Sequence, residues 1–267
     1  MKNILITGAY GGMGRAAVKF LTEKGFYVFA LDKKVGEPEQ NVCPVQADLT
    51  DVESVENAFN TVKGKTDSLY AIVHFAGLYR MDSLVEMSEQ RFTGIFNVNL
   101  FGVYRINKTF LPLLSKGGRI IITSSELAPL DPLPFTGIYG ITKTALEKYA
   151  YSLRMELQLI GIKVSVVRPG AVKTTLLNDS TKELNDFCER TELYVYNAEK
   201  FKRIVDKTEA KNVPPEKVAG KVYKALTAKK PKYVYNLNRN FLLRLLNFLP
   251  QRIQNYAIRK ILEPKNK

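Results

Sequence analysis

The feature that most constrains the fold of this chain is a regular alternation between short apolar runs and longer stretches of helical period. The apolar runs are rich in β-branched residues and predict strands at residues 3–7, 27–32, 42–46, 69–75, 119–124, 163–168 and 232–235. The stretches between them predict helices at residues 12–24, 52–63, 89–114 and 138–160, with another beginning near residues 214–215. Such alternation favours a parallel sheet, because parallel strands need a crossover connection. We therefore predict one α/β domain over residues 1–267, a doubly wound parallel sheet with helices on both faces.

Composition narrows the class of protein. Hydrophobic residues make up 45% and charged residues 25% of the chain, which is ordinary for a globular protein. No apolar run approaches the roughly 20 residues that span a bilayer. An apolar strand follows Met1 almost directly, without a secretory signal pattern, so we expect a cytoplasmic protein. Cys43, Cys188 and the single histidine, His74, show no metal-ligand spacing, so we expect no metal site.

A glycine-rich turn joins the first predicted strand to the first predicted helix. Residues 7–14 read Thr-Gly-Ala-Tyr-Gly-Gly-Met-Gly. Glycines permit a tight turn and close approach of the backbone to a pyrophosphate, and the helix N-terminus supplies unpaired N–H groups and a partial positive charge. The context therefore predicts a Rossmann-type dinucleotide site, with cofactor contacts at Gly8, Gly11, Gly12, Met13 and Gly14.

Two acidic residues near strand ends bear on the choice of cofactor. Asp32 closes the second strand, where a carboxylate can accept hydrogen bonds from the adenosine ribose and repel a 2′-phosphate. Lys33 and Lys34 follow and are able to stabilise that phosphate, and Asp32 can also be a simple turn residue. We predict NAD, with NADP the less favoured cofactor. Asp48, followed by Leu49, either contacts the adenine edge or, like Thr50, caps the next helix.

Tyr139 and Lys143 have the spacing of an acid/base pair. They stand four residues apart near the start of a predicted helix, so their side chains leave the same face. A neighbouring ammonium group favours the phenolate and lowers the pKa of a tyrosine. Such a tyrosine can exchange a proton with a substrate hydroxyl while a nicotinamide exchanges hydride. The pair is a weak signal by itself.

Three further segments should meet Tyr139 at one edge of the sheet. Ser125 follows the strand predicted at residues 119–124, and the Arg-Pro-Gly-Ala-Val-Lys-Thr segment at residues 168–174 follows the next strand. Ligands bind at the carboxyl ends of the strands in doubly wound sheets. These segments and the glycine turn therefore converge on one crevice.

Taken in this order, the motifs resemble the short-chain dehydrogenase/reductase family from residue 2 to about residue 175. The glycine turn fits both the compact and the extended forms of that family, and the chain length and the Asn99 and Pro169-Gly170 context favour the compact form. The resemblance implies a catalytic tetrad of Asn99, Ser125, Tyr139 and Lys143. It also implies further cofactor contacts at Ala76, Gly77, Tyr139, Lys143, Pro169, Gly170, Val172 and Thr174.

By this resemblance each tetrad member has its own task. Ser125 holds the substrate oxygen and Tyr139 transfers the proton. Lys143 binds the nicotinamide ribose and lowers the tyrosine pKa, while Asn99 supports a proton relay through a water. Backbone groups near Gly170 and Val172 orient the nicotinamide amide.

The chain departs from the family pattern at two places. Residues 74–77 read His-Phe-Ala-Gly where many members have Asn-Asn-Ala-Gly, and we expect His74 to replace an asparagine structurally through a side-chain hydrogen bond to the backbone. Ser125 lies 14 residues before Tyr139, one more than expected, which indicates an insertion in the loop at residues 126–137. That loop should border the substrate.

The C-terminal quarter holds the excess positive charge. Residues 200–267 contain 18 Lys and Arg against 4 Asp and Glu, whereas residues 1–199 are balanced. Residues 239–262 predict two short basic amphipathic helices broken at Pro250. These helices can roof an apolar cleft, pack against another subunit, lie reversibly on a membrane, or bind a partner protein. The charge can also be a solvated face, and the segment lacks a nucleic-acid reading motif, so we expect no nucleic-acid partner.

These inferences lead to a predicted function. We expect an NAD-dependent oxidoreductase that interconverts a secondary alcohol and a ketone with Tyr139 as acid/base, beneath a substrate lid at residues 175–213. The leucine-rich lid and tail suggest an apolar, steroid- or lipid-like substrate. A non-catalytic NAD/NADH sensor and a membrane-surface scaffold remain alternatives. We expect a homodimer or homotetramer in which the helices at residues 89–114 and 138–160 pair across a two-fold axis.

Overall fold

Seven parallel strands form the centre of the molecule in a computed structural model that describes residues 1–264, with only the backbone described at residues 175–180 and 209. The strand order is β3-β2-β1-β4-β5-β6-β7, with parallel pairing throughout. The strands are β1 (Lys2–Thr7), β2 (Phe26–Asp32), β3 (Val42–Gln46), β4 (Leu69–His74), β5 (Leu114–Thr123), β6 (Lys163–Pro169) and β7 (Val234–Leu237). The predicted doubly wound α/β fold is confirmed.

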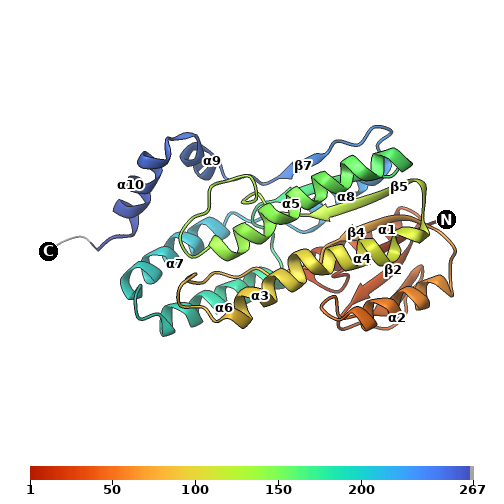
Figure 1. The fold of residues 1–267 in the computed structure, drawn as a ribbon, viewed down its shortest axis with the longest axis horizontal. Coiled ribbons are helices and arrows are strands. Elements are labelled where there is room, and N and C mark those ends of the chain that lie inside the picture. Colours follow the sequence, from red (N-terminus) through yellow and green to blue (C-terminus); the bar gives the residue numbers. More distant parts are fainter. Residues whose placement is uncertain (265–267) are drawn as a thin grey trace.

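Helices cover both faces of this sheet (Figure 1). On one face α1 (Gly12–Glu23) packs beside α8 (Glu216–Thr227), and their buried residues join one apolar cluster with the strands. On the other face α2 (Val52–Lys63), α4 (Val103–Phe110) and α5 (Gly137–Leu157) close a second cluster. The central strands are buried on both sides, which explains why they read as continuous apolar runs.

The chain reverses its direction across the sheet between β1 and β4. Strands β1, β2 and β3 step outward one way, and after α2 the chain returns to place β4 against the other side of β1. In open α/β sheets this switch point creates a crevice at the carboxyl ends of the strands. The glycine turn after β1 and residues 75–77 after β4 therefore lie together at this edge.

The long helix predicted at residues 89–114 is divided in the structure. It consists of α3 (Glu89–Phe96), a π-helical segment η1 (Asn97–Gly102), α4 and a 3₁₀ turn η2 (Leu111–Leu113). Strand β5 then begins at Leu114, five residues earlier than expected. Residues 97–102 contain no proline, so the sequence holds no strong local marker of the interruption.

Three smaller expectations need correction. The cap of α2 is Asp51, whose side chain accepts the Glu53 N–H at 3.1 Å, and neither Asp48 nor Thr50 has that role. The expected lid at residues 175–213, for which the sequence pattern predicted no helix, contains α6 (Thr175–Arg190) and α7 (Val195–Glu209). The last strand is β7, two residues later than predicted. A short 3₁₀ turn, η3 (Gln158–Ile160), ends the α5 region.

The basic tail forms the two predicted helices, α9 (Phe241–Phe248) and α10 (Gln251–Leu262), at one end of the molecule (Figure 1). Asn240 caps α9 through hydrogen bonds from the N–H groups of Leu242 and Leu243. Asn197 of α7 donates to the Leu262 carbonyl at 2.9 Å, so α10 is attached to α7. Within residues 1–264, no helix is both long and apolar enough to cross a bilayer.

Candidate active site

The glycine turn is shaped for close approach of a ligand to the backbone. Gly8 has φ +66°, and a Cβ there would stand 2.4 Å from the Ala76 nitrogen. A Cβ on Gly14 would stand 1.9 Å from the Gly8 carbonyl oxygen, so only glycine lets α1 start this close to the turn. Gly11 is the N-cap of α1 and supplies no side-chain cap, which leaves first-turn N–H groups directed at the crevice.

Asp32 lies at the end of β2, beside the glycine turn. Its Oδ2 accepts the Tyr10 N–H at 2.9 Å, and its Oδ1 accepts the Lys33 N–H at 2.7 Å. The half-buried carboxylate thus holds the turn in place and still has lone pairs toward the edge where a ribose would lie.

Asp48 and Leu49 are less available to a cofactor than the sequence suggested. Asp48 Oδ1 accepts the N–H and hydroxyl of Thr50, and its Oδ2 pairs with Lys33 Nζ at 2.7 Å. These partners, led by Lys33, lower the pKa of Asp48 to about 2. Leu49 is buried and packs against Gly102. Lys33 is therefore bound to an acid, which reduces its capacity to bind a 2′-phosphate.

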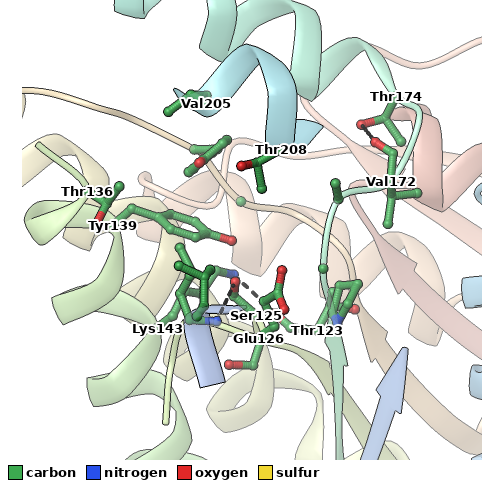
Figure 2. A pocket seen from close by; sticks show the side chains of 18 of the residues that line it. Thr123, Ser125, Glu126, Thr136, Tyr139, Lys143, Val172, Thr174, Val205 and Thr208 are labelled. Carbon is green, nitrogen blue, oxygen red and sulfur yellow. Dashed lines mark hydrogen bonds between the residues drawn. The ribbon is translucent and has the colours of Figure 1, made fainter. Parts of the chain in front are cut away.

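Ser125, Tyr139 and Lys143 meet in one cavity, as predicted. Ser125 follows β5, and its hydroxyl accepts the Leu127 N–H at 3.2 Å. Tyr139 and Lys143 lie in the first two turns of α5, and Lys143 Nζ donates to the Thr123 carbonyl at 3.1 Å. Figure 2 shows Tyr139 above Ser125 and Lys143, with its hydroxyl toward the middle of the cavity.

The protonation of Tyr139 differs in direction from the expectation. Burial raises the pKa of Tyr139 to about 12, a hydrogen bond with Ser125 lowers it, and the charge of Glu126 raises it further. Lys143 Nζ lies 5.7 Å from the tyrosine ring centroid and is directed to Thr123, so the expected lowering of the pKa of Tyr139 by the ammonium is not found. Burial lowers the pKa of Lys143 itself to about 8.

Asn99 lies behind the cavity wall, in the π-helical segment η1. Its Oδ1 accepts the Leu78 N–H at 2.7 Å, and its Nδ2 donates to the Leu78 carbonyl and the Thr142 hydroxyl. A Cβ on Gly77 would stand 3.3 Å from Asn99 Oδ1 and 3.5 Å from Lys143 Nζ. Asn99 and Lys143 therefore flank Gly77, and the Asn99 amide fixes the loop that begins there. Its part in a proton relay stays a prediction.

His74 has a structural environment, but its partner is not the backbone. Its Nε2 lies 2.9 Å from the side-chain oxygen of Asn107 on α4, and Asn107 Nδ2 donates to the Tyr149 hydroxyl. Burial lowers the pKa of His74 to about 4, despite the opposing effect of the hydrogen bond that His74 makes to Asn107 Oδ1. The neutral ring therefore links β4 to α4 and α5.

The cavity extends the site beyond the predicted residues. It encloses about 180 Å³ and has a mostly apolar wall. Its predicted lining residues are Met13, Gly77, Ser125, Tyr139, Lys143, Pro169, Gly170, Val172 and Thr174. Gly8, Gly11, Gly12, Gly14, Asp32, Asp48, Leu49, Ala76 and Asn99 do not line this cavity. The first five follow the sheet edge away from it, where the other half of a dinucleotide would extend.

Sequence reasoning missed several lining residues. Glu126 and Thr136 belong to the loop expected to border the substrate, and Tyr79 packs edge-to-face against Tyr139 with ring centroids 4.5 Å apart. One face of α7 and Leu243 of α9 complete the roof, and Figure 2 shows Val205 and Thr208 above Tyr139. The roof residues are Phe201, Ile204, Val205, Thr208 and Leu243. The helical spacing of Phe201, Ile204, Val205 and Thr208 is the sequence signal that could have found the α7 residues.

The comparisons with known proteins identify the family. A sequence model of the short chain dehydrogenase family matches residues 2–185, so the chain belongs to this family of oxidoreductases. Its members bind nicotinamide dinucleotides, NAD or NADP.

Relatives and solved structures resemble much of the chain. A 3-ketodihydrosphingosine reductase of Bacteroides thetaiotaomicron is 27% identical over 260 residues, covering 96% of both chains. Mouse estradiol 17-beta-dehydrogenase 2 is 34% identical over 66% of this chain and 49% of its own length. A short chain dehydrogenase from Burkholderia cenocepacia in complex with NADP has a TM-score of 0.71 at 22% identity, over 99% of this chain and 100% of that one. A 3-ketoacyl-(acyl-carrier-protein) reductase from Brucella melitensis complexed with NADH has a TM-score of 0.72 at 20% identity, over 88% and 96%.

The residues present fit a nicotinamide dinucleotide. A Cβ on Gly12 would stand 2.6 Å from the Thr174 side chain, so the glycine turn and the segment after β6 approach each other closely. The buried hydroxyls of Thr123 and Ser124, at the carboxyl end of β5, have no hydrogen-bond partner among the residues whose side chains the structure describes. Unpaired polar groups at this edge suit a polar ligand.

Proposed function

We propose that this protein is an NAD-dependent oxidoreductase that interconverts an apolar secondary alcohol and a ketone. One observation carries the proposal: Ser125, Tyr139 and Lys143 line a single apolar cavity, next to a glycine turn that lacks a side-chain cap. Bound in the crevice, the nicotinamide supplies or accepts hydride. The chain itself positions the substrate oxygen and moves the proton.

Each side chain has a step that its environment supports. The Ser125 hydroxyl donates a hydrogen bond to the substrate oxygen, and the Tyr139 hydroxyl gives that oxygen a proton as negative charge develops. Burial raises the pKa of Tyr139 to about 12, so the phenol is protonated at neutral pH and is ready to donate. This favours ketone reduction. Lys143 would hold the nicotinamide ribose. Asn99 would keep the loop after Gly77 next to that ribose.

Asp32 supports the choice of NAD. The carboxylate lies where the adenosine ribose would lie, and a 2′-phosphate there would meet its negative charge. Lys33 is paired with Asp48 and Lys34 is exposed, so one of the two candidate phosphate ligands is already engaged. Backbone groups of Pro169, Gly170 and Val172 would contact the nicotinamide.

A lipid-like substrate fits the roof. The α7 and α9 side chains over Tyr139 are mainly apolar, and relatives named for acting on a ketosphingoid base and on estradiol belong to the same family. Residues 175–213 would open and close over this substrate. Their role as a lid rests on the α7 lining residues.

The test is turnover of long-chain ketones followed by NADH absorbance, comparing wild type with Tyr139→Phe. We expect the variant to lose on the order of 10²–10⁴-fold in kcat while it binds NAD as tightly as wild type, because only the proton donor is removed. Near-full activity of the variant would overturn the assigned acid. NAD binding without turnover of any ketone or alcohol tested would favour a sensor of the NAD/NADH ratio instead.

A further inference from the structure

Glu126 is a buried acid that the chemistry above does not use. It directly follows Ser125, lines the same cavity, and is only 9% exposed. Its backbone N–H donates to the Pro169 carbonyl at 2.9 Å, which fixes the residue between the end of β5 and the end of β6. Figure 2 shows Glu126 next to Ser125 on the cavity floor.

The two carboxylate oxygens of Glu126 have different surroundings. Oε2 accepts the Asn240 N–H at 2.5 Å, immediately before α9. Oε1 lies 2.7 Å from the position that a Cβ on Gly170 would take, and among the described side chains and backbone groups none donates a hydrogen bond to it. One oxygen thus holds the tail, and the other remains open beside the turn where substrate and cofactor would meet.

No cation neutralises this acid within the described part of the chain. Arg239 is a positive group whose charge acts on it, but Arg239 is exposed and forms no ion pair with it there. Lys143 is directed to the Thr123 carbonyl. Burial accordingly raises the pKa of Glu126, and its charge in turn raises the pKa of Tyr139, so the carboxylate lies within electrostatic reach of the reacting hydroxyl. A buried charge of this kind is costly unless it is paired.

We propose that the Glu126 carboxylate is the binding site for a protonated amine carried by the substrate near the carbon that reacts. This inference rests on the proposed function, which places the reacting carbon between Ser125 and Tyr139. The substrate would be an amphiphile with an apolar chain under α7 and α9 and an ammonium group on Glu126. An ammonium group is the ligand that a buried, half-satisfied carboxylate prefers.

The test is calorimetric binding at pH 7 of decylamine and of decan-2-ol, with NADH present so that decan-2-ol binds without being oxidised. We expect wild type to prefer the amine by at least about 10-fold. Glu126→Gln should remove that preference and leave decan-2-ol binding unchanged, because glutamine still accepts the Asn240 N–H but carries no charge. Glu263→Gln, which removes a half-buried acid outside the cavity that is paired with Arg259, should keep the preference. Glu126→Asp, which retains the charge, should keep part of it.

Three outcomes would overturn the inference. Wild type could show no preference for the amine, or the preference could survive in Glu126→Gln. Glu126→Gln could also lose binding of both ligands equally, which would mean that Glu126 serves only to hold Asn240. If Glu126→Gln is unstable, the wild-type preference and the Glu126→Asp variant still decide the question.

A parallel assay compares reduction of a long-chain 2-amino-3-ketone with reduction of the same 3-ketone without the amine. Failure to reduce either ketone would reject the proposed function while the binding experiment still decides the role of Glu126.

Discussion

At the scale of single residues, burial decides the protonation of the groups around the cavity. It raises the pKa of Tyr139 to about 12 and lowers the pKa of Lys143 to about 8, so both shifts favour the neutral form. Sequence spacing alone pointed to an ammonium that lowers the tyrosine pKa. The spacing correctly predicted which side chains meet. It could not show that the Lys143 ammonium donates its hydrogen bond to the Thr123 carbonyl.

Asp32 should determine the cofactor preference. We expect wild type to bind NAD more tightly than NADP, and Asp32→Ala to narrow the difference, because the substitution removes the charge that repels a 2′-phosphate. Calorimetric titration of both nucleotides measures this. Lys33→Ala is a useful comparison, since Lys33 is paired with Asp48 and its loss should change NADP affinity less. Equal or reversed affinities in wild type would contradict the assignment.

His74 should make folding stability depend on pH. The pKa of His74 is about 4 in the fold and about 6.5 when unfolded, so the unfolded chain binds a proton first as pH falls. The stabilisation is complete above pH 6.5 and is lost between pH 6.5 and 4. From pH 7.5 to 5 wild type should lose about 2 kcal/mol more in unfolding free energy than His74→Gln, which can still donate to Asn107. Urea titrations at both pH values test this, and equal losses would show that His74 titrates normally.

At the scale of secondary structure elements, local sequence signals were sufficient to predict most helices and strands. Contacts between residues far apart in the chain could not be predicted from them. The strands, the glycine turn and the break at Pro250 were predicted because periodicity, glycine and proline act within a few residues. The π-helical segment was missed because residues 97–102 contain no proline to mark an interruption. Glu126 was also missed as a site residue, because its partner Asn240 lies 114 positions away and the sequence cannot show that they meet.

Helix α9 has two faces with different expected roles. Leu243 lines the cavity, whereas Phe248 is 80% exposed. If α9 is part of the substrate roof, Leu243→Ser should lower kcat/KM toward long-chain ketones by about 10-fold or more, because an apolar contact with the substrate is lost. Phe248→Ser should leave activity in solution unchanged. Equal effects of the two variants, or none, would count against a roof.

The outer face of α9 also permits a direct check of membrane contact. Phe241, Leu245 and Phe248 are exposed beside Arg244, and each basic residue near an anionic surface contributes about 1 kcal/mol. Vesicle binding through this face would require acidic lipid and would weaken at about 0.5 M salt. Flotation of wild type and Phe248→Ser with such vesicles separates this possibility from a purely intramolecular roof, which is the arrangement that we favour.

At the scale of the whole molecule, parallel pairing places every strand's carboxyl end at one edge. Loops that follow β1, β4, β5 and β6 therefore meet there, although they span residues 8–174 of the chain. This is why motifs scattered through the sequence were enough to locate the cavity. The excess positive charge lies in the last quarter, and α9 and α10 project at one end (Figure 1). Exposed apolar side chains lie elsewhere, along the helices on the face of the sheet covered by α4 and α5.

That face should be a subunit interface. Phe101 in η1 is 46% exposed and Met155 in α5 is 48% exposed, and together with Tyr104 and Tyr151 they leave apolar surface uncovered on the two neighbouring helices. We expect two copies to pair through these helices about a two-fold axis, which buries the same patch on both subunits. Light scattering at micromolar concentration should give about 60 kDa, twice the 30.2 kDa of one chain, or a multiple of it. Phe101→Glu combined with Met155→Glu should give monomers, because like charges would face each other across the axis, whereas Leu193→Glu, exposed outside these helices, should not. A 30 kDa species in wild type, or a dimer that survives the double substitution, would exclude this interface.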